Sequence, residues 1–123
     1  MEEKIKISPK DATEIAKADA RVLVEILEYL PDAVVSKSII KKLTGAVTVS
    51  SLDDGQGFAE KISPFDTFVQ IIEGKAEVVI NNKSRILKTG DGIVIPAHKS
   101  NSIKAEGRFK MISTVIKSGY ESD

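Results

Sequence analysis

The chain has 123 residues, no cysteine, and 18 basic against 18 acidic side chains, so its formal net charge is zero. This length predicts one domain with a core of its own. The balanced charge argues against a nucleic-acid partner and against an anionic membrane partner. The lack of cysteine excludes disulfides, thiolate metal sites and a cysteine nucleophile.

Residues 1–4 are polar, and no apolar run approaches the roughly 20 residues that span a bilayer. We therefore expect a cytoplasmic protein.

Residues 1–32 form an N-terminal arm whose apolar residues are spaced for a helix. Ser8 and Pro9 suit the cap and first position of that helix, and Pro31 ends it. Val22, Val24 and Ile26 also alternate, so a strand over 21–28 stays open. The arm is therefore helical or extended. The apolar residues at helical spacing are Ala12, Ile15, Ala16, Val22, Leu23, Ile26, Leu27 and Leu30.

From residue 33 the pattern changes to short runs rich in Val, Ile and Thr. Glycine, asparagine and aspartate separate these runs, with two-residue turns expected at Thr44-Gly45, Glu73-Gly74 and Asn81-Asn82. The residues predict a β-sandwich or barrel over 33–117, then a polar tail over 118–123. The expected strands are 34–43, 46–52, 67–72, 75–80, 84–87, 92–95, 102–105 and 109–116.

Two stretches place glycines and a proline at fixed offsets within these runs. They read Gly55-x5-Lys61-x-Ser63-x3-Thr67-x6-Gly74 and Gly90-x5-Pro96-x-His98-x2-Asn101. This frame resembles the two metal-binding motifs of the cupin superfamily, in its small single-domain, conserved-barrel form. In that family the ligand seats hold His, His and Glu, then a fourth His. Here the same seats hold Lys61, Ser63, Thr67 and Asn101, so the metal site is degenerate.

The resemblance implies an all-β fold, a cupin-like double-stranded β-barrel (jelly roll). It also implies a homodimer, and the apolar stripe of the arm independently needs a surface of the barrel or of a partner to bury itself. For function the resemblance says little, because one fold hosts many chemistries.

Residues of a barrel strand alternate between the inside and the outside. If the family seats point inward here too, they form a pocket with a polar mouth and an apolar floor. We expect the pocket to be lined by Lys61, Ser63, Thr67, Val69, Ile71, Asn101 and Ile103.

The pocket residues do not form a donor set for a transition metal, which needs converging imidazole, carboxylate or thiolate ligands. The ammonium of Lys61 repels a divalent cation, and His98 is the one imidazole of the chain. We therefore expect no metal and no other cofactor.

No residue is assigned a catalytic role, and His98 and Lys61 are the two candidates. His98 suits proton transfer near neutral pH, but a rim histidine in a turn is the plainer interpretation. Lys61 suits an anionic ligand or an amine reaction, but a lysine at a rim usually keeps its charge in water.

Three functions stay open. The first, which we prefer, is a metal-free, non-catalytic or accessory cupin that binds a small polar molecule in the barrel. The second is a metal-independent isomerase, epimerase or decarboxylase that uses His98 and Lys61. The third is an interaction module with a collapsed pocket.

Overall fold

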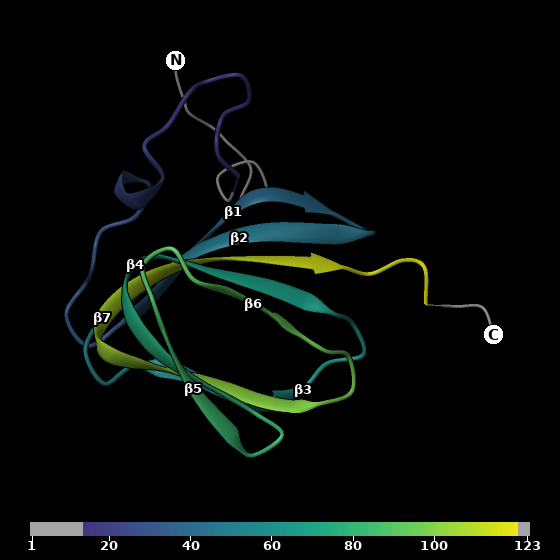
Figure 1. The fold of residues 1–123 in the computed structure, drawn as a ribbon. Coiled ribbons are helices and arrows are strands. Elements are labelled where there is room, and N and C mark those ends of the chain that lie inside the picture. The colour runs from purple at the N-terminus through teal and green to yellow at the C-terminus, as the bar shows by residue number, and fades with distance from the viewer. Residues whose placement is uncertain (1–13, 121–123) are drawn as a thin grey trace.

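The computed structural model describes residues 14–120 as a β-barrel of seven strands (Figure 1). One short 3-10 helix, η1 (Leu23–Glu25), precedes the strands, and no helix in the described part of the chain is long and apolar enough to cross a membrane. The strands are β1 (Val34–Lys42), β2 (Gly45–Leu52), β3 (Gly57–Ile62), β4 (Thr67–Ile80), β5 (Lys83–Lys88), β6 (Gly92–Ile95) and β7 (Ser100–Ile116).

Two long strands, β4 and β7, pair with each other along most of their length and run through both layers of the barrel. The second half of β7 pairs with β2, and the first half of β4 pairs with β6. Beyond the bends, the first half of β7 pairs with β3 and the second half of β4 pairs with β5. Figure 1 shows β1 and β2 in one layer and β3 and β5 in the other. All pairs are antiparallel, as in a jelly roll.

Glycines mark the bends in β4 and β7. Gly74 has a φ of 91°, and a Cβ atom there would lie 2.2 Å from the carbonyl oxygen of Arg108. Gly107 has a φ of 83°. The register of the pair shifts on both sides of Gly74. Only glycine combines this backbone conformation with so close an approach of the neighbouring strand.

The prediction of separate strands at 67–72 and 75–80, and again at 102–105 and 109–116, is therefore wrong. Each couple is one continuous strand, and the turn expected at Glu73-Gly74 is a bulge within β4. A second error is the omission of β3 (Gly57–Ile62), whose alternation of polar and apolar residues is poor.

The other strand predictions are confirmed to within two residues, namely 34–43, 46–52, 84–87 and 92–95. The turn at Asn81-Asn82 is also confirmed, with φ values of 52° and 69° between the paired residues Ile80 and Lys83. The β1–β2 turn uses Leu43 and Thr44, one residue earlier than expected.

The inner face changes from polar to apolar along the barrel axis. Each of four inward rows begins with a polar residue and ends with an apolar one at the same end of the barrel. The rows are Thr48-Ser50-Leu52, Ser113-Met111-Phe109, Asn101-Ile103-Ala105 and Thr67-Val69-Ile71. We call the apolar end, around Leu52, Phe109 and Ala105, the closed end.

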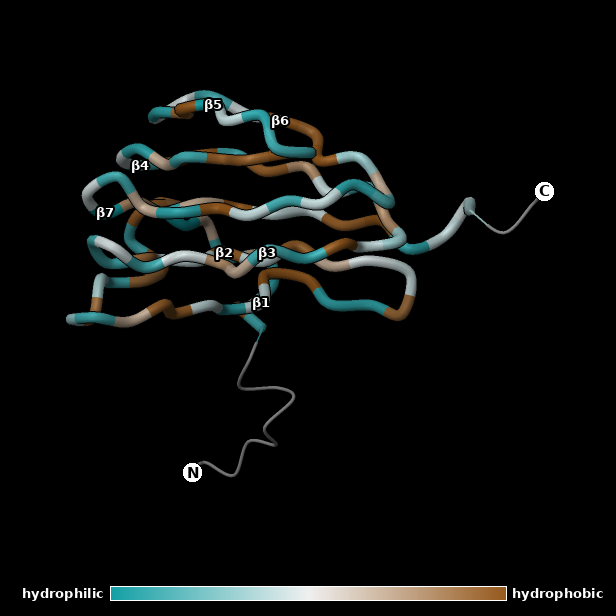
Figure 2. The backbone as a smooth tube through the Cα atoms, turned by 90° about the horizontal axis from the view of Figure 1, so that it is seen from below, coloured by the Kyte–Doolittle hydropathy of each residue, from teal (hydrophilic) through white to brown (hydrophobic). Residues whose placement is uncertain are grey.

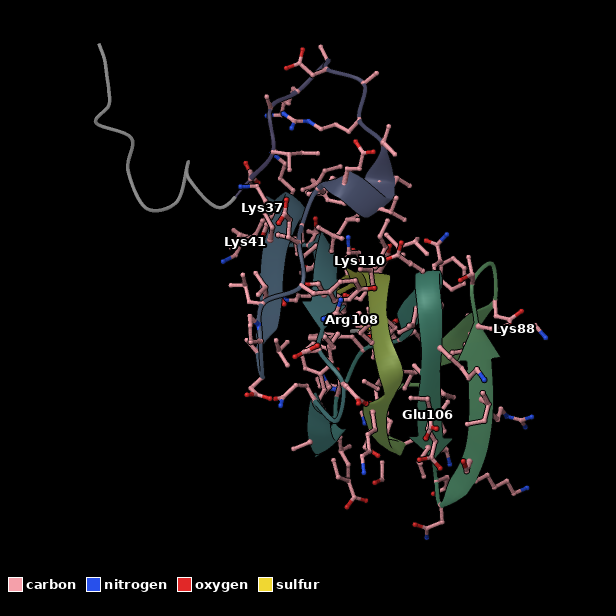
Figure 3. The ribbon with its side chains drawn as sticks, turned by 90° about the vertical axis from the view of Figure 1, so that its left-hand side faces the viewer. Lys37, Lys41, Lys88, Glu106, Arg108 and Lys110 are labelled. Atoms are coloured by element: carbon pink, nitrogen blue, oxygen red, sulfur yellow. The ribbon has the colours of Figure 1, made fainter. Side chains whose placement is uncertain are left out.

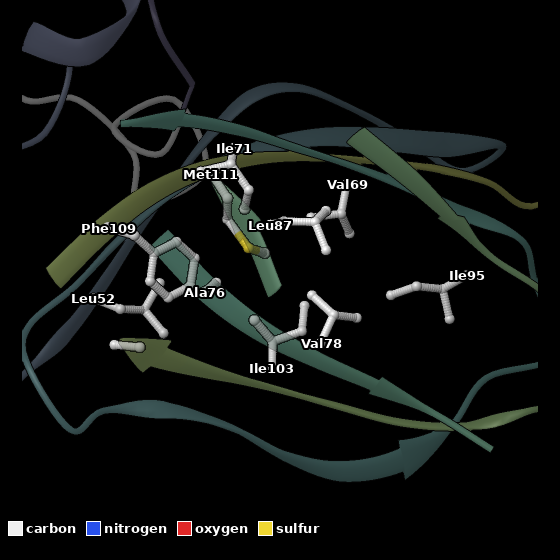
Figure 4. Close-up of a cluster of buried hydrophobic side chains, with 11 residues drawn as sticks. Leu52, Val69, Ile71, Ala76, Val78, Leu87, Ile95, Ile103, Phe109 and Met111 are labelled. Carbon is white, nitrogen blue, oxygen red and sulfur yellow. The ribbon is translucent and has the colours of Figure 1, made fainter. Parts of the chain in front are cut away.

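The hydrophobic core fills the closed end and continues toward the middle of the barrel. Phe109, Leu52 and Ala76 are fully buried, and Figure 4 shows Phe109 and Leu52 at one side of the cluster and Ile95 toward the other. Figure 2 shows hydrophobic stretches within the strands and hydrophilic ones at many of the connecting turns. Close packing of this cluster supplies most of the hydrophobic stabilisation.

The described part of the N-terminal arm is irregular apart from η1, so the predicted longer helix is wrong there, and so is the alternative strand over 21–28. The expected cap at Ser8 and Pro9 lies outside the described residues. The arm is held by the barrel: the Ile15 N–H donates to the Ser38 carbonyl (3.1 Å), and the Ser51 hydroxyl donates to the Glu28 carbonyl (2.9 Å). Such tertiary hydrogen bonds replace the internal ones of a helix.

The arm covers the outside of β7 at the closed end. Lys110 is 7% exposed, its ammonium donates to the Val24 carbonyl, and it lies 4.8 Å from the centre of the Tyr29 ring. The Tyr29 hydroxyl donates to Glu73 (2.7 Å), and burial, together with this hydrogen bond, raises the pKa of Tyr29 well above its ordinary value. Figure 3 shows Arg108 and Lys110 on β7 beside the arm.

Candidate functional site

A cavity of about 180 Å³ occupies the polar end of the barrel interior. Its walls come from six of the seven strands, all except β5, and from Ser63 in the segment between β3 and β4. Eight of the lining side chains carry a polar group and five are apolar. The lining residues are Ser36, Thr48, Ser50, Phe58, Lys61, Ser63, Thr67, Val69, Ile95, Asn101, Ile103, Met111 and Ser113.

The structure brings six of the seven expected pocket residues to this cavity, namely Lys61, Ser63, Thr67, Val69, Asn101 and Ile103. The exception is Ile71, which does not line it. Ile71 is 1% exposed and packs in the core, because β4 carries it one step further toward the closed end than Val69.

His98 lies outside the cavity. It is exposed in the turn between β6 and β7, with a φ of 69°, and its backbone N–H donates to the Ser63 carbonyl (2.7 Å). The His98 backbone therefore joins the β6–β7 turn to the segment after β3, while the His98 imidazole does not line the cavity. His98 and Lys61 do not share one pocket.

Asn101 is the most deeply buried polar residue of the cavity wall apart from Ser50, with 4% of its surface exposed. Its side-chain nitrogen donates to two backbone carbonyls, those of Lys61 and Lys99, at 3.3 Å each. Two carbonyl acceptors fix the orientation of the amide, since an amide oxygen there would face other oxygens. The Asn101 Oδ1 atom accepts no hydrogen bond from the described residues.

Six hydroxyl side chains complete the polar lining. Ser36 and Ser50 hydrogen-bond each other at 2.7 Å, and Ser63 accepts the Phe65 N–H at 3.1 Å. The hydroxyls of Thr48, Thr67 and Ser113 form no hydrogen bond with any other described residue. Together with Asn101 Oδ1 they leave unused donor and acceptor capacity on the wall.

The sequence did not predict the hydroxyls of Ser36, Thr48, Ser50 and Ser113 as cavity groups. They come from strands outside the two motifs, and their inward direction depends on registers such as Ser36 opposite Ser50 and Thr48 opposite Ser113. Strand alternation in 46–52 and 109–116 was the one available signal, but alternation alone does not say which face is the inside.

Lys61 is the one charged residue in the cavity lining. It is exposed, and its ammonium lies 6.0 Å from the centre of the Phe58 ring. Two acidic residues close to Lys61 in the sequence form other hydrogen bonds: Glu60 accepts the Ser100 hydroxyl, and Asp66 accepts the Ala97 N–H (2.8 Å). Lys61 forms no ion pair with any residue that the structure describes.

These residues do not fit a cupin-type transition metal. An ammonium, two hydroxyls and an amide occupy the four seats, and the amide nitrogen of Asn101 is already bonded to carbonyls. Within residues 14–120, no three His, Cys, Asp or Glu side chains gather into a possible metal site. Such a site needs converging imidazole, carboxylate or thiolate donors, so no chemistry is assigned to a metal here.

No protein-family model matches the sequence, and no curated protein matches it. Solved structures do match. A conserved protein of unknown function from Streptococcus pyogenes is 30% identical, with 85% of this chain and 91% of that chain covered, and a TM-score of 0.81.

Two other similar structures carry the name of a fold family. A cupin superfamily protein from Desulfitobacterium hafniense is 23% identical over 86% of this chain and 96% of that chain, with a TM-score of 0.78. A cupin 2 conserved barrel domain protein from Leptotrichia buccalis is 26% identical over 76% of this chain and 46% of that chain, with a TM-score of 0.74. With the two-layer barrel and the glycine frame of its motifs, the chain belongs to the cupin superfamily as a small cupin domain.

Proposed function

We propose that this cupin is a metal-free, non-catalytic binding domain that holds a small polar molecule in the barrel cavity. The observation that carries the proposal is the buried Oδ1 atom of Asn101, which has no donor among the described residues. Leaving a buried acceptor unpaired costs about 1–3 kcal/mol, so a ligand that donates to it gains affinity.

The wall around this atom supports the same proposal. The hydroxyls of Thr67, Thr48 and Ser113 are available, and Val69, Ile103 and Met111 supply an apolar surface behind them. An apolar cavity with a few convergent polar groups is the usual form of a small-molecule site. An interaction module with a collapsed pocket is less well supported, since the cavity is open.

Catalysis has weaker support. An isomerase, epimerase or decarboxylase that uses His98 and Lys61 needs both groups within hydrogen-bond reach of one substrate. His98 is exposed in a rim turn and does not line the cavity. Lys61 alone offers one ammonium and no base to accept a proton.

The test is a binding screen of the full-length chain against small hydroxylated, amide and carbonyl compounds, followed by titration of each hit. We expect Asn101→Leu and Thr67→Val each to lower the affinity for a bound compound about tenfold, which corresponds to the loss of one hydrogen bond of about 1.4 kcal/mol. Thr114→Val is the matched control, because Thr114 is the neighbour of Ser113 on β7 and does not line the cavity.

Two results would contradict the proposal. One is a screen without any hit, and the other is a hit whose affinity is unchanged by both cavity variants. Elemental analysis of protein purified without an affinity tag tests the metal-free state, and a stoichiometric transition metal would overturn that part. The homodimer implied by the family resemblance stays a prediction, which light scattering of the purified chain can check.

A further inference from the structure

The charges around the cavity are one-sided. Lys61 is a cation without an ion-pair partner among the described residues, and no carboxylate lines the cavity. A cavity with one positive charge and no negative charge favours a ligand with one negative charge. The six hydroxyls and the amide are neutral and can hydrogen-bond both anionic and uncharged ligands. The preference for an anion therefore comes from Lys61.

Asn101 favours a ligand that also carries a hydrogen-bond donor. Its Oδ1 atom is an acceptor, and a carboxylate has only acceptors to offer it. A bare carboxylate would therefore repel this oxygen, whereas a ligand with an additional hydroxyl donates to it. The free hydroxyls of Thr67 and Ser113 can bond either the carboxylate or the hydroxyl.

The two groups that make these demands are neighbours. Lys61 and Asn101 are directly opposite each other in the β3–β7 pair, and the Asn101 amide is anchored on the Lys61 carbonyl at 3.3 Å. Opposite residues in an antiparallel pair have Cα atoms about 4.5–5.5 Å apart. An anionic group and a hydroxyl on adjacent carbons of one small molecule can therefore meet both residues.

Size limits the ligand further. A cavity of about 150 Å³ holds one benzene molecule, so the volume of about 180 Å³ suits a ligand of similar size. We therefore expect a compound of about five to ten non-hydrogen atoms inside the cavity.

We infer, on the basis of the proposed function, that the cavity binds a small hydroxylated monocarboxylate, with its carboxylate at Lys61 and its hydroxyl donating to Asn101 Oδ1. The ion pair forms at the mouth, where water still has access. Its contribution is therefore modest and falls with added salt.

The experiment compares matched compounds by calorimetry or by NMR titration of the full-length protein. Glycolate, lactate and glycerate are the hydroxycarboxylates, lactamide and propane-1,2-diol lack the charge of lactate, and propionate lacks its hydroxyl. We expect lactate to bind about tenfold more tightly than lactamide, because lactate forms one additional ion pair in partly screened surroundings. We also expect the affinity for lactate to fall in 0.5 M salt. Propionate is expected to be weaker than lactate by a similar factor.

Two lysine variants assign the charge effect. Lys61→Met keeps the length of the side chain and is expected to remove the preference for lactate over lactamide. Lys104→Met is the matched control, because Lys104 is exposed on β7 and does not line the cavity. We expect this variant to keep the ratio of lactate to lactamide affinity within twofold of the parent.

The outcomes separate the inference from the proposed function. If lactamide or the diol binds as tightly as lactate, or if Lys61→Met leaves the preference intact, the carboxylate inference is overturned while a neutral polar site remains. Equal binding of propionate and lactate overturns the role given to Asn101. If none of these compounds binds and the wider screen also yields no hit, the proposed function fails together with the inference.

Discussion

The two ends of this barrel have the same strands and the same alternation, yet they differ in what fills them. At the closed end the inward rows finish in Leu52, Phe109, Ala105 and Ile71, which are all buried in the core. At the other end the same rows begin with Thr48, Ser113, Asn101 and Thr67, which line the cavity.

The difference shows how one architecture divides two tasks. The apolar end supplies packing free energy, because burial of apolar surface grows with the area removed from water. The polar end leaves space and hydrogen-bonding groups that contribute little to stability and are available for a ligand. If this division is right, substitutions at the two ends have very different effects on stability.

The largest expected effect is at the centre of the closed end. Phe109 is fully buried, and Phe109→Ala should lower the free energy of unfolding by about 3–5 kcal/mol, as usual for an aromatic residue deleted from a core. Ser113→Ala, four residues along the same inward row, should change it by less than about 1 kcal/mol. Urea denaturation measures both, and similar losses for the two variants would contradict the division.

The bend between the layers gives the next effect. Gly74 and Gly90 have φ values of 91° and 95°, so alanine at either position has the same backbone strain, about 1–3 kcal/mol. At Gly74 the new Cβ atom would also meet the Arg108 carbonyl at 2.2 Å, whereas Gly90 has no neighbour within 4 Å. We expect Gly74→Ala to cost clearly more than Gly90→Ala in thermal or urea unfolding. Equal costs would show that the close contact at the bend is readily relieved.

The smallest expected effect is a loss of folding stability at acid pH through Asp53, which lies at the closed end. The Asp32 N–H donates to Asp53 (2.8 Å), and this bond, ahead of the contact with Arg108 at 3.2 Å, lowers the pKa of the Asp53 carboxyl. A lowered native pKa means that the ionised carboxyl stabilises the fold above pH 4 and loses this effect as the pH falls through the lowered value.

This sign predicts how the Asp53→Asn variant differs from the parent. The stability difference should be largest near pH 7 and shrink below pH 4, in unfolding curves recorded from pH 7 to pH 2. Arg108→Ala is expected to retain most of the pH dependence, because the backbone donor remains. A stability difference that is constant over the whole range would contradict the assignment to Asp53.

Some features of the fold could be predicted because their cause is local. The turn at Asn81-Asn82 follows from two residues that tolerate positive φ, and β2, β5 and β6 follow from short alternating runs between turn residues. The glycine and proline frame around Gly74, Gly90 and Pro96 indicates the cupin family without the tertiary structure.

Other features needed partners that lie far away in the chain. The sequence around Gly74 predicts the end of a strand, but pairing with β7 continues β4 through this residue. The arm has the apolar spacing of a helix, but hydrogen bonds from Ser51 and Lys110 to its carbonyls hold it against the barrel as an irregular segment with one short 3-10 turn. Local propensity is a weak term, and these tertiary hydrogen bonds outweigh it.

The sequence by itself determined the fold family, the positions of most strands, and six residues of the cavity wall, because glycine offsets and alternation are properties of nearby residues. Only the tertiary structure decided that Ser36, Thr48, Ser50 and Ser113 face the same space, and that His98 and Ile71 do not. Those facts depend on strand register and on the position along the barrel axis, which arise when distant strands pair.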